Sequence, residues 1–434
     1  MTPPLFRPTQ PLRAAALLVL SLCAYGLAPA HAQATSQTPL GTTIDGLLDY
    51  AREHNPDLRV RRLEAEAAHE RIEPAAALPD PRFQLELMDF TNAMTPGRDA
   101  SLLPGQVGTT RYRVIQPVPF WGKRDLRGEL ARTQAEQAET MSDGAALEIE
   151  NGIKIAFARY FLARGQTRIL GETRDLIAAL EKLVLTRYSV GLVPQQDAVR
   201  AQGEITSLKL DLIEAEQRRR DAAARLNTLL ARDADAALAE PAGLPPPPTA
   251  LSRTDLLERI NARSPELSRE RLGVTAAQKN RDLTWLNRYP DMAVGLTNNR
   301  PLNGANNWDL MIEITIPLQQ SSRRAQEREA ERRLDAAQAR VSAAEARLNG
   351  RLGEALAAFE ASRDKASLLR ASLLPQVVAS RDAARSGYES GRVNFNTLIE
   401  AERQILRTRL ALLDAEANTA IRLAELEFLT GAPL

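Results

Sequence analysis

The chain has two patterns of apolar positions, and they predict two kinds of element. Over long stretches apolar or small side chains recur every seven residues, as in the row Leu398, Ile405, Leu412, Thr419 and Leu426. A period of 3.5 residues is typical of closely packed coiled-coil helices. Four short segments alternate polar and apolar residues, cleanly at 82–87 and 309–316 and less cleanly at 110–115 and 292–297. Such alternation indicates strands with one apolar face, so we predict a mainly α-helical chain with a small β part.

The predicted elements follow one plan twice. Each half has a helix of about 35 residues, two strand segments joined by a loop, a helix of about 65 residues, a turn, and a second helix of about 35 residues. The helices are expected at 44–78, 123–188 and 195–231, and again at 254–288, 323–386 and 395–430. At ~1.5 Å per residue the long helix spans roughly 100 Å, as do the two short ones in line, so one can lie against the other two. Pro375 should kink or locally unwind the second long helix.

Matching residues in the two halves indicate an internal duplication. Leu47-Leu48-Asp49 pairs with Leu256-Leu257-Glu258 at a separation of 209 residues. Tyr188, Gly191, Val193 and Ala201 pair with Tyr388, Gly391, Val393 and Ala401 at a separation of 200. We therefore predict two structural repeats, 33–243 and 251–434, joined by a stiff Pro-rich linker at 244–250.

Residues 1–32 have the features of a secretory signal. An apolar run from Ala14 to Leu22 follows two arginines, and Ala30-His31-Ala32 offers a cleavage site. The run is shorter than the roughly 20 residues of a membrane span. Leu22 precedes Cys23, the only cysteine, where a lipoprotein signal needs a small residue, so we expect no lipidation. Since no later stretch is a long apolar run, the exported chain can enter a membrane only with β-strands.

Composition indicates which kinds of partner the chain can bind. With 56 Lys and Arg against 55 Asp and Glu, the chain lacks the basic excess of a nucleic-acid binder. Aromatic residues are scarce, yet several gather at the ends of the strand segments: Phe120, Trp121, Trp285, Tyr289 and Trp308. Amphipathic rings favour the membrane–water interface, and segments of about nine residues are near the length of a tilted membrane strand. A soluble hairpin on a core would alternate in the same way, and the aromatic flanks favour the membrane interpretation.

Four strands are too few for a membrane barrel. Bacterial barrels have at least about eight strands, and open sheet edges are not tolerated in lipid. The strands must therefore be pooled between subunits. The residues alone leave a dimer, a trimer and a tetramer open.

Short motifs then give the chain a family resemblance. They are Asn55-Pro56-Asp57-Leu58 in the first helix, the run from Gln116 to Lys123 after the second strand, and the turns 188–193 and 387–391. In their order on the duplicated plan, the chain resembles the TolC-like outer-membrane efflux proteins over essentially the whole mature length. The resemblance implies a homotrimer with a 12-stranded barrel in the outer membrane of a Gram-negative cell and a periplasmic helical tunnel. It also implies a passive duct that works with a periplasmic adaptor (membrane fusion protein) and an inner-membrane pump, most often of RND type.

The resemblance also assigns roles to residues at the helix turns. The adaptor would meet the two tips, which are Gly191, Leu192 and Val193 and then Gly391, Arg392 and Val393. A hydrogen bond between Tyr388 and Asp197 would hold the entrance shut, although the family's cross-coil arginine is Val393 here. Of the acidic pair that narrows the family's pore, Thr397 occupies the first position and Glu400 the second. We therefore expect one ring of three carboxylates in a trimer.

The cargo is less defined than the architecture, because the resemblance implies export of drugs or of heavy-metal cations. Pro119-Phe120-Trp121-Gly122-Lys123 is similar to a motif of the heavy-metal efflux branch, but Trp121 replaces the expected proline. We expect no cofactor and no resident metal, because the histidines and methionines show no pair at ligand spacing. A periplasmic coiled-coil adaptor is the alternative, although an adaptor has one hairpin rather than two. No nucleophile motif or phosphate loop accompanies the acidic residues near the turns, which argues against an enzyme.

Overall fold

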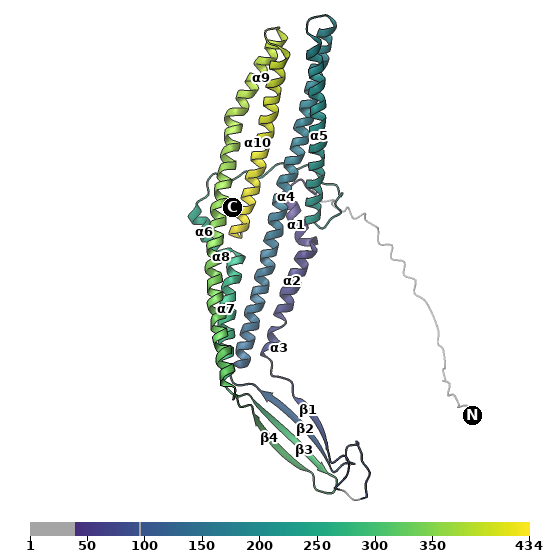
Figure 1. Cartoon of the computed structure of the whole chain (residues 1–434), viewed down its shortest axis with the longest axis vertical. Helices are drawn as coiled ribbons and strands as arrows, with labels where there is room; N and C mark the ends of the chain where they lie inside the picture. The colour runs from purple at the N-terminus through teal and green to yellow at the C-terminus, as the bar shows by residue number, and fades with distance from the viewer. Residues whose placement is uncertain (1–39, 95–96) are drawn as a thin grey trace, which may run out of the picture. The chain divides into compact units, whose positions relative to one another are not determined.

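The structure is a computed structural model, and it describes residues 40–94 and 97–434. The predicted signal at 1–32 and Cys23 lie outside the described residues. Everything described belongs to one unit, Pro39–Leu434. The unit contains two long helical hairpins, shorter helices that lie beside them and one four-stranded sheet (Figure 1). Among the described helices, none is long and apolar enough to cross a membrane.

The first helix of each half is broken, which corrects the prediction of continuous helices at 44–78 and 254–288. The first half has α1 (Ile44–His54), α2 (Pro56–His69) and α3 (Ile72–Ala76), and the second has α6 (Arg253–Arg263) and α7 (Pro265–Leu286). The breaks fall at Asn55 and Ser264, both with ψ of 119°. Each residue precedes a proline, whose ring disfavours the helical conformation before it. Asn55 then caps α2, because its Oδ1 accepts the N–H groups of Asp57 and Leu58.

The long helices follow the expected bounds. The first hairpin is α4 (Lys123–Ser189) with α5 (Gln195–Leu229). The second is α8 (Gln320–Leu368), a π-helical turn η1 (Leu369–Leu373) and α9 (Leu374–Glu389), with α10 (Phe395–Thr430) returning. The π-turn lies directly before Pro375, which has no N–H for the carbonyl of Ala371. The local unwinding expected at Pro375 is thus confirmed.

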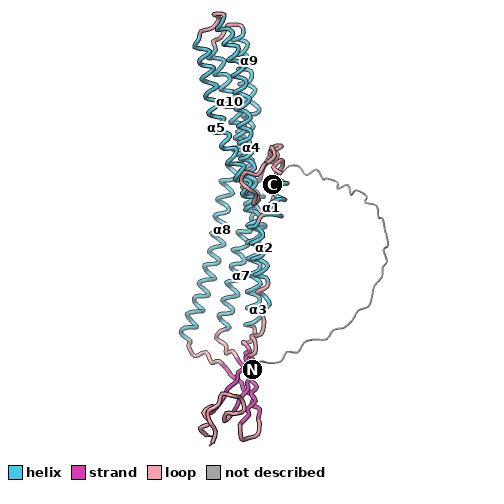
Figure 2. The backbone as a smooth tube through the Cα atoms, turned by 90° about the vertical axis from the view of Figure 1, so that its right-hand side faces the viewer, coloured by secondary structure: helices cyan, strands magenta, loops and turns pink. Residues whose placement is uncertain are grey.

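The core of the helical part is the heptad stripe itself. On α8 five residues at heptad-like spacing are buried, namely Leu334, Ala344, Leu348, Leu352 and Phe359. The helix α4 packs against α5 along the first hairpin, and α10 packs against α4, α8 and α9 (Figure 2). Because α10 has neighbours on more than one side, it buries more of its surface than α5 does. Long thin helices are held together here by side-chain interdigitation along their length, without a central globular core.

The four strands form one antiparallel sheet in chain order. They are β1 (Arg82–Met88), β2 (Thr109–Val118), β3 (Met292–Pro301) and β4 (Asn307–Ile314). The two halves of the chain meet where β2 pairs with β3. The register places Phe83, Val114, Leu296 and Leu310 in one row across the sheet. Their side chains are 67%, 47%, 50% and 71% exposed, so one face of the sheet is an open apolar surface.

The opposite face of the sheet is polar and internally bonded. Arg111 donates to Glu86 at 3.0 Å and to Asn299 at 2.8 Å, which joins β1, β2 and β3. One rung further, Arg113 donates to Thr297 at 3.1 Å. Within the described chain β1 and β4 are edge strands, each paired on one side only.

Candidate functional site

The two hairpin tips have the same backbone. Gly191 and Gly391 have φ of +73° and +72°, a region that residues with a Cβ rarely adopt. In each tip the glycine N–H donates to a tyrosine carbonyl, Tyr188 at 2.9 Å and Tyr388 at 3.1 Å. No atom lies within 4 Å of where a Cβ would stand on either glycine. The glycines are therefore required by the turn itself and not by a close neighbour.

The side chains at the tips point in different directions. Leu192 is 72% exposed and Arg392 is also exposed, so both are available for contact. Val193 and Val393 turn inward and pack against the apolar cluster that closes the hairpin ends. Of the six tip residues predicted to meet an adaptor, the two valines are thus partly buried by contacts within the chain itself.

The predicted latch is not formed in the described chain. The hydroxyl of Tyr388 is buried and has no hydrogen-bond partner. Its ring lies 5.5 Å from Phe395, and the guanidinium of Arg187 lies 5.1 Å from the ring centre. Burial raises the pKa of Tyr388, and the nearby Asp197 carboxylate raises it further. Burial also raises the pKa of Asp197, and the nearby Arg200 opposes this shift.

The two predicted pore residues are engaged locally. Thr397 belongs to the cap of α10, because its N–H and hydroxyl both donate to Asn394 Oδ1, at 2.9 and 3.0 Å. Glu400 is half exposed and accepts a hydrogen bond from Arg403 Nη1 at 2.7 Å. The charge of Glu400 is therefore partly balanced within its own helix.

Arg403 is the residue that sequence reasoning missed. Its Nε donates to both carboxylate oxygens of Glu204, at 3.0 and 3.1 Å, and its Nη2 donates at 2.5 Å. Glu204 is only 9% exposed and lies on α5, so the pair joins the two hairpins. The sequence carried a usable sign of it, because Glu204 is an acidic residue in the row of inward-facing positions between Ala201 and Leu208.

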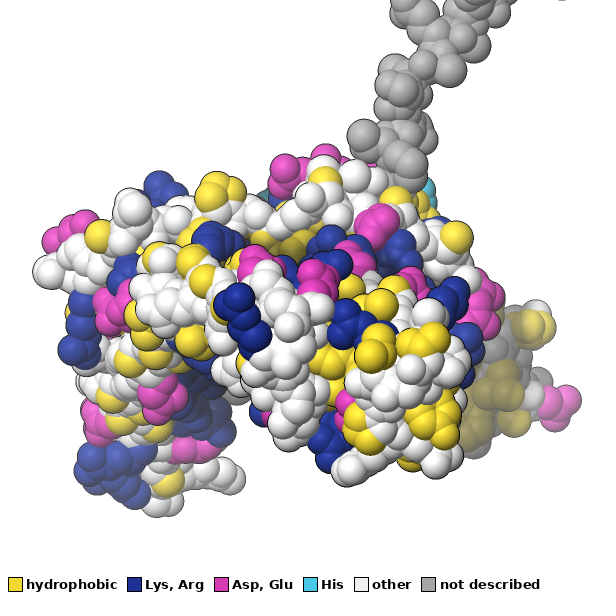
Figure 3. All heavy atoms as spheres, turned by 90° about the horizontal axis from the view of Figure 1, so that it is seen from above, with side chains coloured by type: hydrophobic (Ala, Val, Ile, Leu, Met, Phe, Trp, Pro, Cys, Tyr) yellow, Lys and Arg dark blue, Asp and Glu magenta, His cyan; other side chains and the backbone are white. Residues whose placement is uncertain are grey.

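Other arginines cross between the hairpins in the same region. Arg187 donates to the carbonyls of Tyr388 and Glu389, both at 3.1 Å. Arg200 donates to Asn396, and Arg409 pairs with Glu172 at 2.7 Å. Seen from the hairpin ends, basic, acidic and apolar side chains are interspersed rather than gathered by sign (Figure 3). The hairpins are therefore joined by separate polar links around one apolar cluster.

The strand-end aromatics fall at both ends of the sheet. Phe120 stacks on Tyr289 at 4.5 Å, with Trp121 and Trp285 on either side at 5.6 and 5.5 Å. Trp308 lies at the opposite end, paired with Asn298 and 67% exposed.

An ion pair between a buried lysine and a half-exposed aspartate lies at the end of the sheet that meets the helices. Lys123 is 2% exposed, and its Nζ donates to Asp291 at 2.8 Å and to the Tyr289 carbonyl at 3.1 Å. Asp291 also accepts the Phe120 N–H. Because of the hydrogen bond from Lys123, the pKa of Asp291 is lowered although burial opposes this. These hydrogen bonds thus join the segment between β2 and α4 to the segment between α7 and β3.

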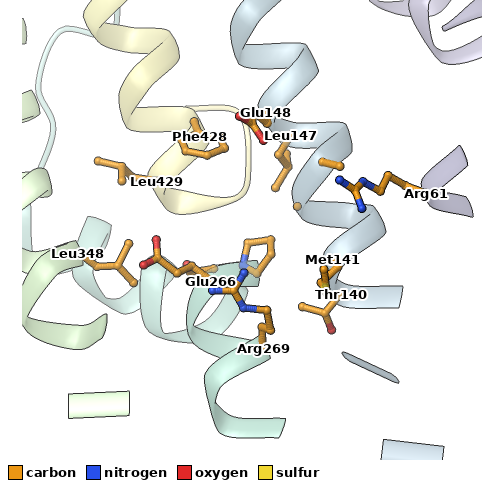
Figure 4. Close-up of a pocket in the computed structure, with 14 residues that line it drawn as sticks. Arg61, Thr140, Met141, Leu147, Glu148, Glu266, Arg269, Leu348, Phe428 and Leu429 are labelled. Carbon is orange, nitrogen blue, oxygen red and sulfur yellow. The ribbon is translucent and has the colours of Figure 1, made fainter. Parts of the chain in front are cut away.

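A cavity of about 370 Å³ lies between α4, α7 and the end of α10 (Figure 4). In it Glu266 accepts hydrogen bonds from Arg347 and Arg351, beside Phe428 and Leu429. Across residues 40–94 and 97–434, no group of three or more His, Cys, Asp or Glu side chains could hold a metal ion.

Comparison with known proteins identifies the family. The model of the outer membrane efflux protein family matches residues 47–232 and 256–432, one stretch in each half. The chain belongs to the outer membrane efflux protein family. The resemblance inferred from the motifs is thus confirmed, and membership agrees with the prediction of an efflux protein rather than an enzyme.

Individual efflux proteins give the same result. The cobalt-zinc-cadmium resistance protein CzcC of Cupriavidus metallidurans is 24% identical over 382 residues, 87% of each chain. The solved structure of CusC matches with a TM-score of 0.75 at 19% identity, over 90% of this chain and 92% of CusC. VceC of Vibrio cholerae matches with a TM-score of 0.75 at 17% identity, over 90% of this chain and 96% of VceC. At these identities the solved structures show the fold, which confirms the duplicated hairpins with four strands.

Proposed function

We propose that three copies of this chain form an outer-membrane efflux channel, in which twelve strands close a barrel and the hairpins form a periplasmic tunnel. The observation that carries the proposal is the sheet, which has an exposed apolar face, a bonded polar face and two free edges. An apolar face of this extent in water is unfavourable, and free edges in lipid leave backbone groups without partners. Pairing β1 of one copy with β4 of the next removes both problems.

The aromatic residues support a membrane position for the sheet. Trp308 and the group around Phe120 mark opposite ends of the strands. On β4 the distance from Trp308 to Ile314 is roughly 20 Å at ~3.4 Å per residue. Membrane barrels have an apolar band about 25 Å tall between two aromatic girdles. The sheet therefore has suitable height and flanks for an outer membrane.

The assembly predicts a direct measurement. Native mass spectrometry of the detergent-extracted protein should give three chains. A stable monomer with the full β-content would overturn the trimer. A stable dimer or tetramer would keep the pooled barrel and change its size.

We further propose that the chain has two structural repeats, 33–243 and 251–434. We also propose that the tips of the hairpins dock onto a periplasmic adaptor, which connects the channel to an inner-membrane pump of RND type. Leu192 supports the contact, because a large apolar side chain 72% exposed at a tip gains from a partner. If a cross-linker placed at position 192 captures the adaptor and one placed at the exposed position 392 does not, the first tip is the one that docks. Equal cross-linking at both tips would remove the special role of Leu192.

For the cargo we propose heavy-metal cations, on the strength of the resistance named for the CzcC relative. A duct needs no tight binding site, so the chain's chemistry is compatible with such a cargo. Deleting the coding sequence should sensitise the host to cobalt, zinc or cadmium, and Leu192→Arg should fail to restore growth. Sensitivity to hydrophobic drugs alone would replace the metal assignment with a drug one.

We retain the latch of Tyr388 with Asp197, and the ring of Glu400 carboxylates beside Thr397, as proposals for the closed entrance. The first is supported by the Tyr388 hydroxyl, which is buried without a hydrogen-bond partner in the described chain and whose pKa is raised by burial and, to a smaller extent, by the Asp197 carboxylate. The half-exposed carboxylate of Glu400 supports the second. Tests for both are given below.

A further inference from the structure

Each hairpin buries one glutamate, and the two are not at matching positions. Glu204 on α5 is 9% exposed and Glu402 on α10 is 4% exposed. At the separation of 200 residues that relates the repeats, Ala201-Gln202-Gly203-Glu204 pairs with Ala401-Glu402-Arg403-Gln404. The carboxylate and the amide have therefore exchanged places. The second hairpin has a buried acid where the first has an exposed Gln202.

The two buried carboxylates differ in their partners. Glu204 accepts three hydrogen bonds from Arg403. The next residue back along α10 is Glu402, and in the described chain no hydrogen bond or ion pair reaches its carboxyl group. Arg403 does not serve it, because the guanidinium is directed to Glu204 and Glu400. Glu402 is thus a residue only 4% exposed whose carboxyl group has no direct protein partner among the described residues, although its oxygens are not among the side-chain atoms fully sealed from solvent.

The charged groups that act on Glu402 all come from α9. They are Arg381, Arg385 and Asp382, and none from α4 or α5 is among them. Both arginines are already engaged, Arg381 with Asp382 at 2.7 Å and Arg385 with Glu389 at 3.2 Å. The attraction they exert on Glu402 is therefore shared with other acids.

Burial has a predictable effect on such a group. An ionised carboxylate in an apolar contact loses its hydration, whereas a protonated one loses little. Burial accordingly raises the pKa of Glu402, and the arginines of α9 offset only part of the effect. Its neighbours along α10 are Leu398, Ile399 and Ile405, all buried.

We propose that Glu402 is a proton-sensitive switch in the α9–α10 hairpin, in which the neutral acid allows close packing of the two helices and the carboxylate loosens it. The inference goes beyond the proposed channel, because it concerns the stability of one hairpin. The folded hairpin binds the proton more tightly than the open one does. Between the ordinary value of 4.5 and the raised pKa, the stability of the hairpin therefore falls as pH rises.

Hydrogen exchange on the full-length protein in detergent tests the switch. After correction for intrinsic rates, amides around Glu402 and on the facing part of α9 should lose protection between about pH 5 and about pH 8. The opening equilibrium should change roughly tenfold for each unit by which the pKa is raised. Glu402→Gln, the amide already present at position 202, should be well protected at both pH values. Protection that is independent of pH in the native chain would overturn the proposal.

Two further variants separate the switch from a general effect of removing charge. Glu204→Gln takes away the partner of Arg403, so it should lower protection at about pH 8, the opposite of Glu402→Gln. Glu402→Met, which packs without a polar group, should match or exceed Glu402→Gln. If all three variants shift protection in the same direction, Glu402 has no special role. The exchange readout concerns the hairpin alone, so its failure would leave the proposed channel untouched.

Discussion

The two hairpins have one design and different polar interiors. The first runs as an unbroken α4 into α5, presents the apolar Leu192 at its tip, and neutralises its buried Glu204 with an arginine from the other hairpin. The second has a π-turn, presents Arg392, and buries Glu402 without a direct partner. At matching positions of the two repeats the buried apolar residues are similar, whereas the buried polar residues differ. The duplicated fold is thus set by the apolar pattern, while a few polar substitutions give each hairpin its own stability and contacts.

The largest expected effect concerns the tips. Leu192→Asp should weaken adaptor binding by about 3 kcal/mol, since burial of a leucine contributes about 1.5–3 kcal/mol and a buried unpaired charge adds a cost. Arg392→Gln, the matched change at the other tip, should have a small effect. Binding of a purified adaptor to both variants measures the difference, with the trimer checked by native mass. Equal losses would mean that the tips do not differ in role.

The next effect concerns the link between the hairpins. Arg403→Met leaves Glu204 buried without its partner, and removing one partner of a buried pair costs about 3–5 kcal/mol. Because the Arg403 side chain is 40% exposed, we expect about 2 kcal/mol here. Hydrogen exchange at the ends of α5 and α10 should report it as faster local opening. Arg200→Met, which removes an exposed link between the same helices, should change exchange little.

A smaller effect is expected at the tyrosines. Removing the unpaired hydroxyl with Tyr388→Phe should leave α9 as stable or up to about 1 kcal/mol more stable, because a buried unsatisfied group is unfavourable. Tyr188→Phe, at the matching and half-exposed position, should change nothing. The latch proposal adds that Tyr388→Phe raises the conductance of reconstituted channels. Unchanged conductance would remove the latch from the closed entrance.

The smallest effect is expected at Glu400. Its pair with Arg403 is exposed and contributes at most about 1 kcal/mol, so Glu400→Ala should leave folding unchanged. In bilayer recordings it should weaken cation selectivity and block by multivalent cations. In the Arg403→Met background the Glu400 carboxylate has no partner. The loss of cation selectivity on Glu400→Ala should therefore be larger in that background than in the native chain. Identical selectivity in both backgrounds would exclude Glu400 from the pore.

The sequence by itself determined the fold class, the order of the elements and the family. Heptad spacing gives long helices, alternation gives strands, and Pro375 gives the π-turn, because each depends on neighbours close in the chain. The prolines at Asn55-Pro56 and Ser264-Pro265 are an equally local signal, although the first helices are predicted without these breaks. The tip glycines were predictable, since their positive φ is a property of the turn.

Only the tertiary structure decided which polar side chains meet. Glu204 and Arg403 are 199 residues apart and bond because two hairpins pack together. Lys123 and Asp291 meet because β2 pairs with β3 and brings two helix–strand junctions to one end of the sheet. Glu402 is buried because α10 has a neighbour on more than one side. Local patterns fix which elements form, but burial and pairing of a charged group depend on the distant elements that surround it.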